Sequence, residues 1–474
     1  MNKDTISLKE KIGYGFGDAA SSMFWKIFGM YSLFFYTDVF GITAAAAGTM
    51  FLIARLWDSV FDVFVGIAAD RTKTKWGKYR PYLLWFAIPF ALMGVITFYV
   101  PDFSTSGKLI YAYITYSLVM IVYSLINVPY ASLLGAISPN PEERNSLSSY
   151  RMAFAFIGSF VTFMLLQPLI DFFAERFDPQ SLDTTQHIVE NSVSTSAIAW
   201  AMGVGVIGLL CVILFILCFS WTKERVQQIE SEENVSITTD LKNLFNNSPW
   251  WILVGTGLAA LLFNAIRDSV AIYYFRDYVQ VNYKMSGTGW DITTIYFLIG
   301  QAANLIGVIA APTISAKYGK KKTYMISILL AGFFSVIFYF IPNNLTFIFI
   351  LQFLISVFAG YVLPLLWSMF ADIVDHQEFL TGRRATGLIF SSSSMSQKLG
   401  WALGAALSGW ILAWFNYVPD APQQTADTIF GERLMISLLP AACCILAFVG
   451  MIFYPLTDKK VKEITRQLEE KRNS

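Results

Sequence analysis

Three ionisable residues share one face of a predicted helix inside an apolar stretch of the chain. Arg55, Asp58 and Asp62 are spaced i, i+3 and i+7, which places them on the same side of an α-helix. Two carboxylates about 5 Å apart repel by about 3 kcal/mol at an effective dielectric constant of about 20. One arginine cannot neutralise both of them. The pattern predicts a site for a cation or a proton, and the alternative is a structural ion pair with Arg55.

A second polar stripe precedes the first one in the chain. Asp18, Ser22 and Lys26 recur every four residues, and Trp25 lies beside them. Lys26 lies more than two helical turns inside an apolar run, where a charged side chain is costly and usually functional. Ser22 and Trp25 also have ordinary explanations, a hydrogen bond to the backbone and packing. We expect this stripe to line a substrate site.

Polar residues also interrupt three later apolar stretches. Ser124, Asn127 and Tyr130 lie in one of them, Arg151 in the next and Lys398 near the end of the chain. An arginine at this depth needs a cavity or a charged partner, so the alternative for Arg151 is a salt bridge to an acidic residue of a neighbouring helix. Lys398 faces a different side from the small residues that form the packing ridge of its own helix. We therefore include these residues in the candidate site.

The composition indicates a membrane protein. Of the 474 residues, 55% are hydrophobic, and the mean hydropathy is +0.53, whereas soluble domains rarely exceed half apolar residues. The net charge of +1 argues against nucleic acid as a partner. The four cysteines lie in apolar runs without metal-ligand or disulfide spacing, and only two histidines occur. We expect no cofactor and no signal peptide.

Twelve stretches are long and apolar enough to cross a bilayer as helices, which requires about 20 residues. They are residues 12–38, 44–69, 81–100, 109–137, 148–174, 195–220, 249–277, 289–314, 323–341, 346–374, 387–414 and 432–454. The sequence therefore predicts an all-α membrane protein with twelve transmembrane helices, embedded in a lipid bilayer.

The distribution of positive charge predicts the topology. With the N-terminus in the cytoplasm, 24 of the 34 lysines and arginines lie on the cytoplasmic side and 5 on the other, which follows the positive-inside rule. We expect both termini in the cytoplasm and the protein in the inner (plasma) membrane. The polar connection 221–248 divides the chain into six-helix bundles at 1–220 and 249–456, followed by a tail at 457–474. Such a duplication is typical of transporters with a site between two halves.

Several motifs together resemble the glycoside–pentoside–hexuronide:cation symporters of the major facilitator superfamily. The motifs are Tyr14-Gly15-Phe16-Gly17-Asp18, the segment 35–41, Arg55-x-x-Asp58-x-x-x-Asp62, Asp70-Arg71-Thr72, the segment 77–81, the segment 371–375 and Lys398. The resemblance covers essentially the whole chain. It implies symport of a sugar, glycoside or hexuronide with Na⁺ or H⁺ by alternating access, in a protein that is not an enzyme and that is expected to act as a monomer.

The resemblance also assigns roles to single residues. It implies that Asp58 and Asp62 bind the coupling cation, which is Na⁺ or H⁺. It also implies that Ser124 stands where a threonine helps to bind that cation. Arg151 resembles the family's sugar-binding arginine and Lys398 its cavity lysine. The family member that carries melibiose has aspartates where this chain has Ser22 and Asn127, which puts specificity for α-galactosides in doubt.

These departures change the charge balance of the predicted cavity. Arg151, Lys398 and Lys26 face fewer carboxylates than in the melibiose-transporting relative. An acidic sugar such as a uronide would suit an arginine fork. The alternative is a neutral pentoside or hexoside, with Lys26 paired to Asp18 or another acidic group. Asn127 and Tyr130 complete the predicted sugar contacts.

Two further alternatives and one gating hypothesis remain at this stage. The chain could be an uncoupled facilitator of another small solute, or an intramembrane enzyme with an Asp motif, although it has no second Asp-rich motif. For gating, we expect a cytoplasmic clamp in which the basic loop after the second span pairs with acidic residues after the tenth. The residues of this clamp are Arg71, Lys78, Arg80, Asp372 and Asp375.

Overall fold

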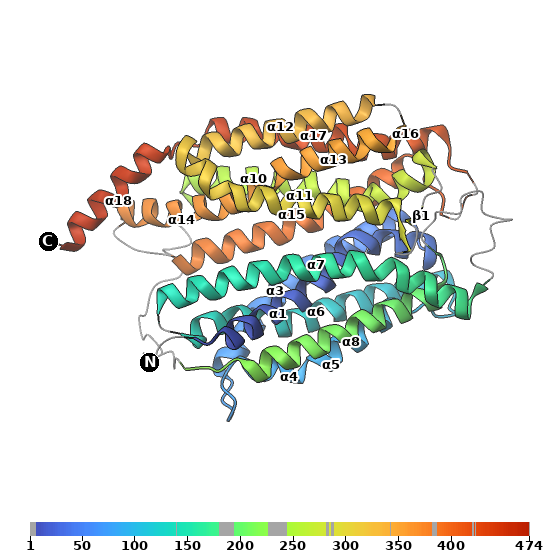
Figure 1. Ribbon diagram of the computed structural model, residues 1–474, viewed down its shortest axis with the longest axis horizontal. Coiled ribbons are helices and arrows are strands. Elements are labelled where there is room, and N and C mark those ends of the chain that lie inside the picture. The colour runs from blue at the N-terminus through green and yellow to red at the C-terminus, as the bar shows by residue number, and fades with distance from the viewer. Residues whose placement is uncertain are drawn as a thin grey trace. The chain divides into compact units, whose positions relative to one another are not determined.

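The computed structural model describes residues 6–138, 140–179, 194–225, 244–280, 284–285, 289–341, 343–381, 386–419, 421 and 423–473. Residues 226–243, most of the predicted connection between bundles, lie outside the described residues. Almost every described element is a helix (Figure 1). The exceptions are the short antiparallel strands β1 (Lys284–Met285) and β2 (Trp290–Asp291), in which Lys284 pairs with Asp291.

The helical elements follow the predicted apolar stretches closely. Those before residue 226 are α1 (Leu8–Lys26), π-helix η1 (Ile27–Tyr31), α2 (Ser32–Phe34), π-helix η2 (Phe35–Val39), α3 (Ala44–Arg71), α4 (Arg80–Trp85), α5 (Ala87–Thr97), α6 (Thr105–Ile137), α7 (Pro141–Phe177) and α8 (Ala197–Trp221). Those after it are α10 (Ser248–Tyr273), π-helix η4 (Tyr274–Val279), α11 (Ile292–Tyr318), α12 (Lys320–Phe340), α13 (Leu345–Gly360), α14 (Val362–Thr381), α15 (Thr386–Trp414), α16 (Ala426–Ile436), α17 (Leu438–Ile452) and α18 (Asp458–Asn473).

Each of the twelve predicted stretches falls on helix. Eight segments within the described residues have the length and hydropathy of a membrane span. These eight are Thr105–Ile137, Ser146–Phe177, Ala197–Trp221, Ser248–Val279, Ile292–Tyr318, Lys320–Phe340, Leu345–Thr381 and Ala426–Ile452. The prediction of an all-α membrane protein is confirmed, and the count of twelve spans stays a prediction.

The chain forms two compact units. Unit 1 comprises Met1–Ser231, Ile272–Leu298 and Gly409–Ile429, and unit 2 comprises Glu232–Ala271, Ile299–Ser408 and Phe430–Ser474. Four described helices therefore contribute to both units. The last residues of α10 and α15 and the first residues of α11 and α16 belong to unit 1. The predicted division into bundles at 1–220 and 249–456 stays a prediction.

Unit 1 is built around the first helical run, which consists of α1, η1, α2 and η2. Helix α1 packs against α7 and α8, and α3 packs against α6. Ser7 caps α1 by accepting a hydrogen bond from the backbone of Glu10, and Thr43 caps α3. After α1 the chain stays helical as far as Val39 but widens into the π-helical turns η1 and η2. Such turns are rare and frequent at functional sites, and here they lie next to Lys26 and contain Asp38.

In unit 2, α12 packs against α13 and α17, and α14 packs against α18. The buried Arg267 of α10 donates hydrogen bonds to the side chain of Gln352 at 2.9 Å and to the carbonyl oxygen of Ile436 at 2.5 Å. Its guanidinium lies 4.7 Å from the ring centroid of Phe338. Arg267 therefore has a structural explanation, because a buried charge is tolerated where its donors are satisfied.

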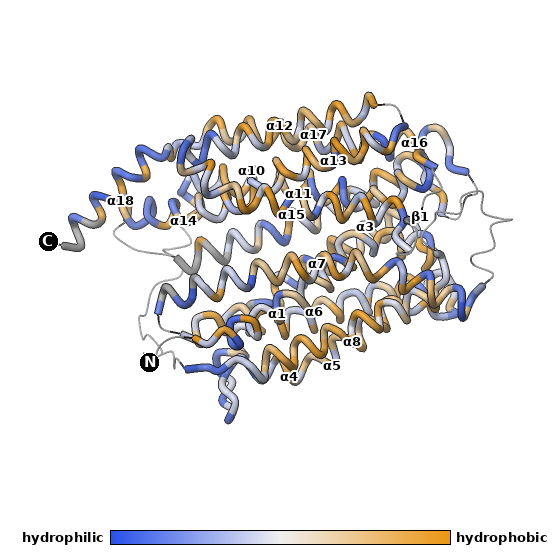
Figure 2. The backbone as a smooth tube through the Cα atoms, viewed as in Figure 1, coloured by the Kyte–Doolittle hydropathy of each residue, from blue (hydrophilic) through white to orange (hydrophobic). Residues whose placement is uncertain are grey.

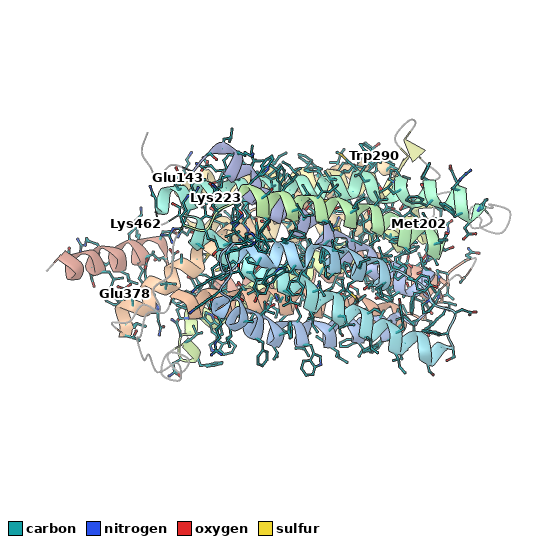
Figure 3. The ribbon with its side chains drawn as sticks, turned by 90° about the horizontal axis from the view of Figure 1, so that it is seen from below. Glu143, Met202, Lys223, Trp290, Glu378 and Lys462 are labelled. Atoms are coloured by element: carbon teal, nitrogen blue, oxygen red, sulfur yellow. The ribbon has the colours of Figure 1, made fainter. Side chains whose placement is uncertain are left out.

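Polar residues gather at the ends of the helices. Figure 2 shows apolar residues along the helix lengths and a hydrophilic α18. In unit 1, Lys11 pairs with Glu143 at 2.8 Å, and Glu10 accepts hydrogen bonds from Arg225 and from the backbone of Lys223. Figure 3 shows Glu143 and Lys223 at one end of the unit 1 helices, opposite Trp290. The hydrogen bond that Arg225 donates to the Glu10 carboxylate raises the pKa of Arg225, so this end of unit 1 is held by charged pairs outside the apolar layer.

Candidate functional site

Helices α3 and α6 bring the predicted cation ligands together. Asp58 is buried, with 1% of its surface exposed, and its Oδ1 accepts a hydrogen bond of 2.5 Å from the hydroxyl of Ser124, which is equally buried. The Oδ2 atom lies 3.9 Å from a guanidinium nitrogen of Arg55. This separation exceeds a hydrogen-bond distance, so these two atoms interact as opposite charges without a direct hydrogen bond.

The remaining predicted cation ligands lie on the same two helices. Asp62 is half-buried one turn after Asp58 on α3, and Asn127 is half-buried one turn after Ser124 on α6. Arg55, Asp58 and Asp62 together carry one positive and two negative charges, which leaves one negative charge in this group. Carboxylate, hydroxyl and amide oxygens are the ligands that hard cations prefer. The group therefore has the chemistry to hold one monovalent cation or one proton.

The predicted sugar ligands Asp18 and Arg151 bind each other. Arg151 of α7 donates a hydrogen bond of 2.8 Å from Nε to Oδ2 of Asp18 on α1. The side chains are 28% and 13% exposed, so solutes can reach the pair. This contact is the salt bridge to a neighbouring helix that the sequence left open as the alternative for Arg151. A paired carboxylate and guanidinium still offer acceptors and donors to sugar hydroxyls.

Tyr130 packs against the arginine of this ion pair. Its ring centroid lies 5.2 Å from the Arg151 guanidinium, and its hydroxyl donates a hydrogen bond of 2.8 Å to the backbone carbonyl of Tyr14. The rings of Tyr14 and Tyr130 stack with centroids 4.9 Å apart. A side chain at Gly17 would collide with the Tyr130 ring. The glycine in the Tyr14–Asp18 motif is thus required for α1 to approach α6.

Trp25 connects the substrate stripe to the cation ligands. The Arg55 guanidinium lies 4.1 Å from the Trp25 ring centroid, a favourable cation–π distance. The ring centroids of Trp25 and Tyr123 lie 6.0 Å apart. Tyr123 is itself within electrostatic range of Asp18, Arg55, Asp58 and Arg151. A change in charge at the carboxylates of α3 can therefore act over short distances on the substrate stripe of α1.

The other predicted substrate residues have different surroundings. Ser22 is half-buried on α1. Lys26 is half-buried at the last residue of α1, with Nζ 5.6 Å from the ring centroid of Phe163 on α7. Lys398 is half-buried on α15 and belongs to unit 2. Its place beside the residues of unit 1 stays a prediction.

The predicted basic half of the clamp is fixed within unit 1. The carboxylate of Glu224 accepts hydrogen bonds of 2.8 Å from the backbone N–H groups of Lys78, Tyr79 and Arg80. Arg80 also donates to the carbonyl oxygen of Phe219 at 2.6 Å. Burial and a hydrogen bond to Asp70 raise the pKa of Tyr79. The loop therefore has a defined shape before any partner is considered.

The acidic half of the predicted clamp lies in unit 2. Asp372 of α14 accepts a hydrogen bond of 2.7 Å from Nζ of Lys320, and Asp375 is half-buried one turn later. Arg71, by contrast, is exposed at the end of α3 in unit 1. Because the clamp would join the two units, its pairs stay a prediction.

A cluster that sequence reasoning missed lies at the C-terminal end of the first helical run (residues 8–39). Arg276 of η4 donates hydrogen bonds to Asp38 of η2 at 2.6 Å, to Asp277 at 2.7 Å and to the hydroxyl of Tyr417 at 2.7 Å. Tyr417 donates to Asp38 at 2.6 Å. All four residues belong to unit 1. Two signals in the sequence pointed to this cluster. Asp38 lies inside the motif at residues 35–41, and Arg276 lies at the end of a predicted span.

This helical architecture, with ionisable residues inside its spans, defines a multi-pass membrane transporter. Residues 13–458 match the model of the MFS/sugar transport protein family, and the chain belongs to that family. It is therefore a secondary transporter of the sugar transport class and not an enzyme, as the sequence predicted. The resemblance to glycoside–pentoside–hexuronide:cation symporters is confirmed at the level of this family.

Named relatives cover nearly the full length of the chain. An isoprimeverose transporter of Lactiplantibacillus pentosus is 33% identical over 99% of this chain and 93% of its own. A glucuronide carrier protein homolog of Escherichia coli (strain K12) is 32% identical over 100% of this chain and 97% of its own. The inner membrane symporter YicJ of the same strain is 33% identical over 99% and 96%.

Solved structures agree on the fold. The nucleoside transporter NupG superposes with a TM-score of 0.61 at 16% identity, over 94% of this chain and 99% of that one. A bacterial homolog of the human lysosomal transporter Spinster superposes with a TM-score of 0.65 at 12% identity, over 94% and 95%. At these identities the likeness supports the transporter fold alone.

Proposed function

We propose that the protein couples the entry of a cation to the uptake of a glycoside. The names of the relatives support this substrate class, since one is an isoprimeverose transporter, one is a glucuronide carrier protein homolog and a third is an inner membrane symporter. The observation that carries the proposal is the buried Asp58, which accepts from Ser124 and faces Arg55, with Asp62 on the next turn. A site with one excess negative charge suits one Na⁺ or one proton.

The coupling follows from differential binding. A ligand shifts a conformational equilibrium only by the difference in its affinity for the two states. Cation binding at Asp58 would change the field on Arg55, and Arg55 lies on the Trp25 ring next to the sugar stripe. One cation that moves through about 100 mV releases about 2.3 kcal/mol. That is enough for about 50-fold accumulation of one sugar per cation.

The ion pair of Asp18 and Arg151 is the proposed sugar-binding element. Sugar hydroxyls donate to carboxylates and accept from guanidinium groups, so one glycoside can bridge both residues. Arg151 already has a carboxylate partner, and this favours a neutral glycoside over a hexuronide, whose carboxylate would compete with Asp18. Lys26 and, from unit 2, Lys398 are proposed to contribute further donors.

The cluster around Arg276 is the proposed outer closure of the route. The positive-inside rule puts the N-terminus in the cytoplasm, so the far end of the first helical run would face outward. There Asp38, Arg276 and Tyr417 join η2, η4 and the segment after α15. We propose that these bonds break when the carrier opens outward and that the protein resides in the inner membrane.

Uptake in sealed vesicles tests the proposal. The purified protein is reconstituted, and a panel of labelled neutral glycosides and their uronic-acid counterparts is offered with a Na⁺ gradient, a pH gradient or neither. We expect accumulation above the external concentration with one of the two gradients only. Equilibration without accumulation under every condition would instead identify an uncoupled facilitator.

A further inference from the structure

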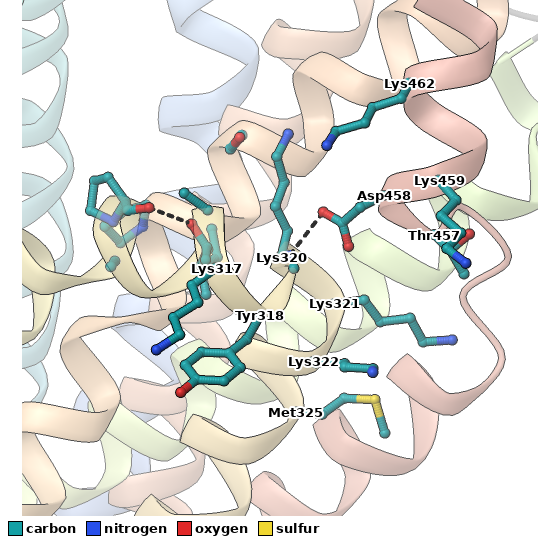
Figure 4. Close-up of a pocket in the computed structure, with 18 residues that line it drawn as sticks. Lys317, Tyr318, Lys320, Lys321, Lys322, Met325, Thr457, Asp458, Lys459 and Lys462 are labelled. Atoms are coloured by element: carbon teal, nitrogen blue, oxygen red, sulfur yellow. Dashed lines mark hydrogen bonds between the residues drawn. The ribbon is translucent and has the colours of Figure 1, made fainter.

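A lysine-rich cavity lies in unit 2, away from every residue assigned to transport except the neighbouring Asp372. It has a volume of about 1070 Å³ and lies between the last turn of α11, the first turns of α12, α14 and the start of α18 (Figure 4). Six lysines line it, and they are Lys317, Lys320, Lys321, Lys322, Lys459 and Lys462. Among the described residues that line it, Asp458 is the only acidic one.

Some of these charged side chains already bind other groups of the protein. Asp458 accepts a hydrogen bond of 3.0 Å from the backbone of Lys320 and so caps the start of α12. Its carboxylate occupies the space that a side chain at Gly319 would need, and Gly319 adopts a positive φ of 90°. Lys320 binds Asp372, and Lys321 donates to the backbone carbonyls of Ile452 and Tyr454.

Three of the other four lysines are available to a ligand. Lys322, Lys459 and Lys462 are exposed and form no hydrogen bond or ion pair with the part of the chain that the structure describes. Figure 4 shows Lys462 extending from α18 toward the end of Lys320. Even with Asp458 and Asp372 counted, six lysines leave four excess positive charges around one cavity. Like charges at this density repel, and a bound anion would relieve the repulsion.

We propose that this cavity binds the phosphate headgroup of an anionic phospholipid. Lysine is a common ligand of phosphate, and basic pockets at the ends of membrane helices bind anionic headgroups. The place of the cavity selects a lipid over free phosphate, because α11 and α12 are membrane spans and their ends lie at the bilayer surface. Pro312, Met325 and Leu365 give the cavity an apolar side.

The surface beyond the cavity suits the acyl chains. Ile309 on α11 is 68% exposed and Ile326 on α12 is 55% exposed. Both lie within three residues of cavity-lining residues of their own helices. An exposed apolar surface next to a basic cavity matches both parts of a phospholipid, whereas a soluble phosphate would use only the lysines.

The test measures lipid binding by the full-length protein in a non-ionic detergent, without any transport assay. The probes are phosphatidylglycerol, phosphatidylcholine and inorganic phosphate, and the readout is the midpoint of thermal unfolding, which rises with ligands that bind the folded state. We expect phosphatidylglycerol to raise the midpoint more than phosphatidylcholine, and phosphate to have little effect. In the K322Q/K462Q variant the apparent affinity for phosphatidylglycerol should fall about 5-fold per lysine.

Two controls make the result decisive. Lys73 and Lys75 are also exposed and lie in unit 1, so K73Q/K75Q removes the same charge elsewhere and should respond like the wild type. The K322R/K462R variant retains the charge and should retain the lipid effect, even if the glutamine variant folds poorly. Lipid retention in native mass spectrometry provides the second measurement. An equal response of K322Q/K462Q and the wild type, or stabilisation by phosphate alone, would overturn the proposal.

Discussion

Arg276 donates a hydrogen bond of 2.6 Å to Asp38, although 238 positions separate them in the chain. The Asp38 carboxylate is fully buried and Arg276 is 15% exposed. Tyr417 donates to the same carboxylate oxygen, so three distant segments meet at one acidic group. A buried carboxylate with two such donors stabilises the arrangement in which they meet and is costly to break.

The Asp38→Asn variant should loosen this end of unit 1. Loss of the charge weakens hydrogen bonds worth about 1.5–3 kcal/mol each when charged, while Arg276 retains its contact with Asp277. We expect faster hydrogen exchange of the backbone amides in residues 27–39 and slower sugar turnover at nearly constant apparent affinity. Asp102, which is exposed in a loop of the same unit, supplies the control variant D102N. Unchanged exchange in D38N would show that the cluster does not hold the segment.

The Asp58→Asn variant should abolish cation-coupled accumulation. The substitution removes one of the two negative charges next to Arg55 and leaves that group neutral, so a cation gains no Coulomb energy by binding there. The same outcome is expected for D62N. Uptake against a gradient in vesicles is the measurement, and D102N should accumulate sugar like the wild type. A variant at Asp58 that still concentrates sugar in a cation-dependent way contradicts the assignment.

The Ser124→Ala variant should weaken cation binding without abolishing it. Its hydroxyl donates to Asp58, and hydrogen bonds to charged groups contribute about 1.5–3 kcal/mol. We expect the cation concentration for half-maximal uptake to change by about tenfold or more, while the sugar specificity is retained. Ser132 on the same helix donates to the backbone carbonyl of Val128 and not to a carboxylate of the described residues, so S132A is the matched control. Equal changes in both variants would indicate a general effect on helix α6.

The Lys26→Gln variant distinguishes neutral from acidic substrates. If Lys26 binds a uronide carboxylate, its loss should weaken inhibition of uptake by the uronide far more than inhibition by the neutral glycoside. We expect the neutral glycoside to inhibit better in the wild type and the order to be unchanged in K26Q, because Arg151 already pairs with Asp18. Uptake of one labelled glycoside is measured in competition with the unlabelled uronide and with the unlabelled neutral glycoside, in the wild type and in K26Q. A uronide that inhibits best and loses its advantage in K26Q would reverse this expectation.

The Asp372→Lys variant tests the cytoplasmic clamp. Asp372 binds Lys320 within unit 2, and the clamp prediction adds Lys78 and Arg80 as partners when the cytoplasmic side closes. Charge reversal should slow turnover more than it weakens sugar binding, because it disfavours one conformation and leaves the site intact. Kinetics of uptake and equilibrium sugar binding are compared for D372K and D102K. A loss of binding that matches the loss of turnover would argue against a gate.

Hydropathy predicted the helices well, because the length of an apolar stretch is a local property. The predicted stretch 44–69 became α3 (Ala44–Arg71), and 109–137 became α6 (Thr105–Ile137). The stretch 81–100 instead divides at Phe86 into α4 and α5. The π-helical turns η1 and η2 were not predicted, since their widening depends on packing with distant segments such as Trp200, whose ring lies 5.7 Å from that of Phe35.

The prediction of the site covered the residues that share one helix. It was incomplete for contacts between residues of different helices. The spacing of Arg55, Asp58 and Asp62 identified the face of α3, because helical period alone aligns them. The partner of Arg151 required the fold: charge alone demanded an acidic residue but could not select Asp18. Likewise, the lysines of α12 and α18 were read only as topology signals, since their shared cavity depends on how α18 packs on α14.

The position of Trp25 also makes it an optical probe. The Arg55 guanidinium lies 4.1 Å from the indole ring centroid, and the Tyr123 ring centroid lies 6.0 Å from it. Indole fluorescence responds to nearby charge. A cation that binds at Asp58 and moves Arg55 should therefore change the intensity or the emission wavelength of Trp25 fluorescence. The chain has 13 tryptophans, and the difference between the wild type and W25F isolates this one. Ion binding could then be followed by light in the detergent-solubilised protein, with no sugar and no membrane gradient present.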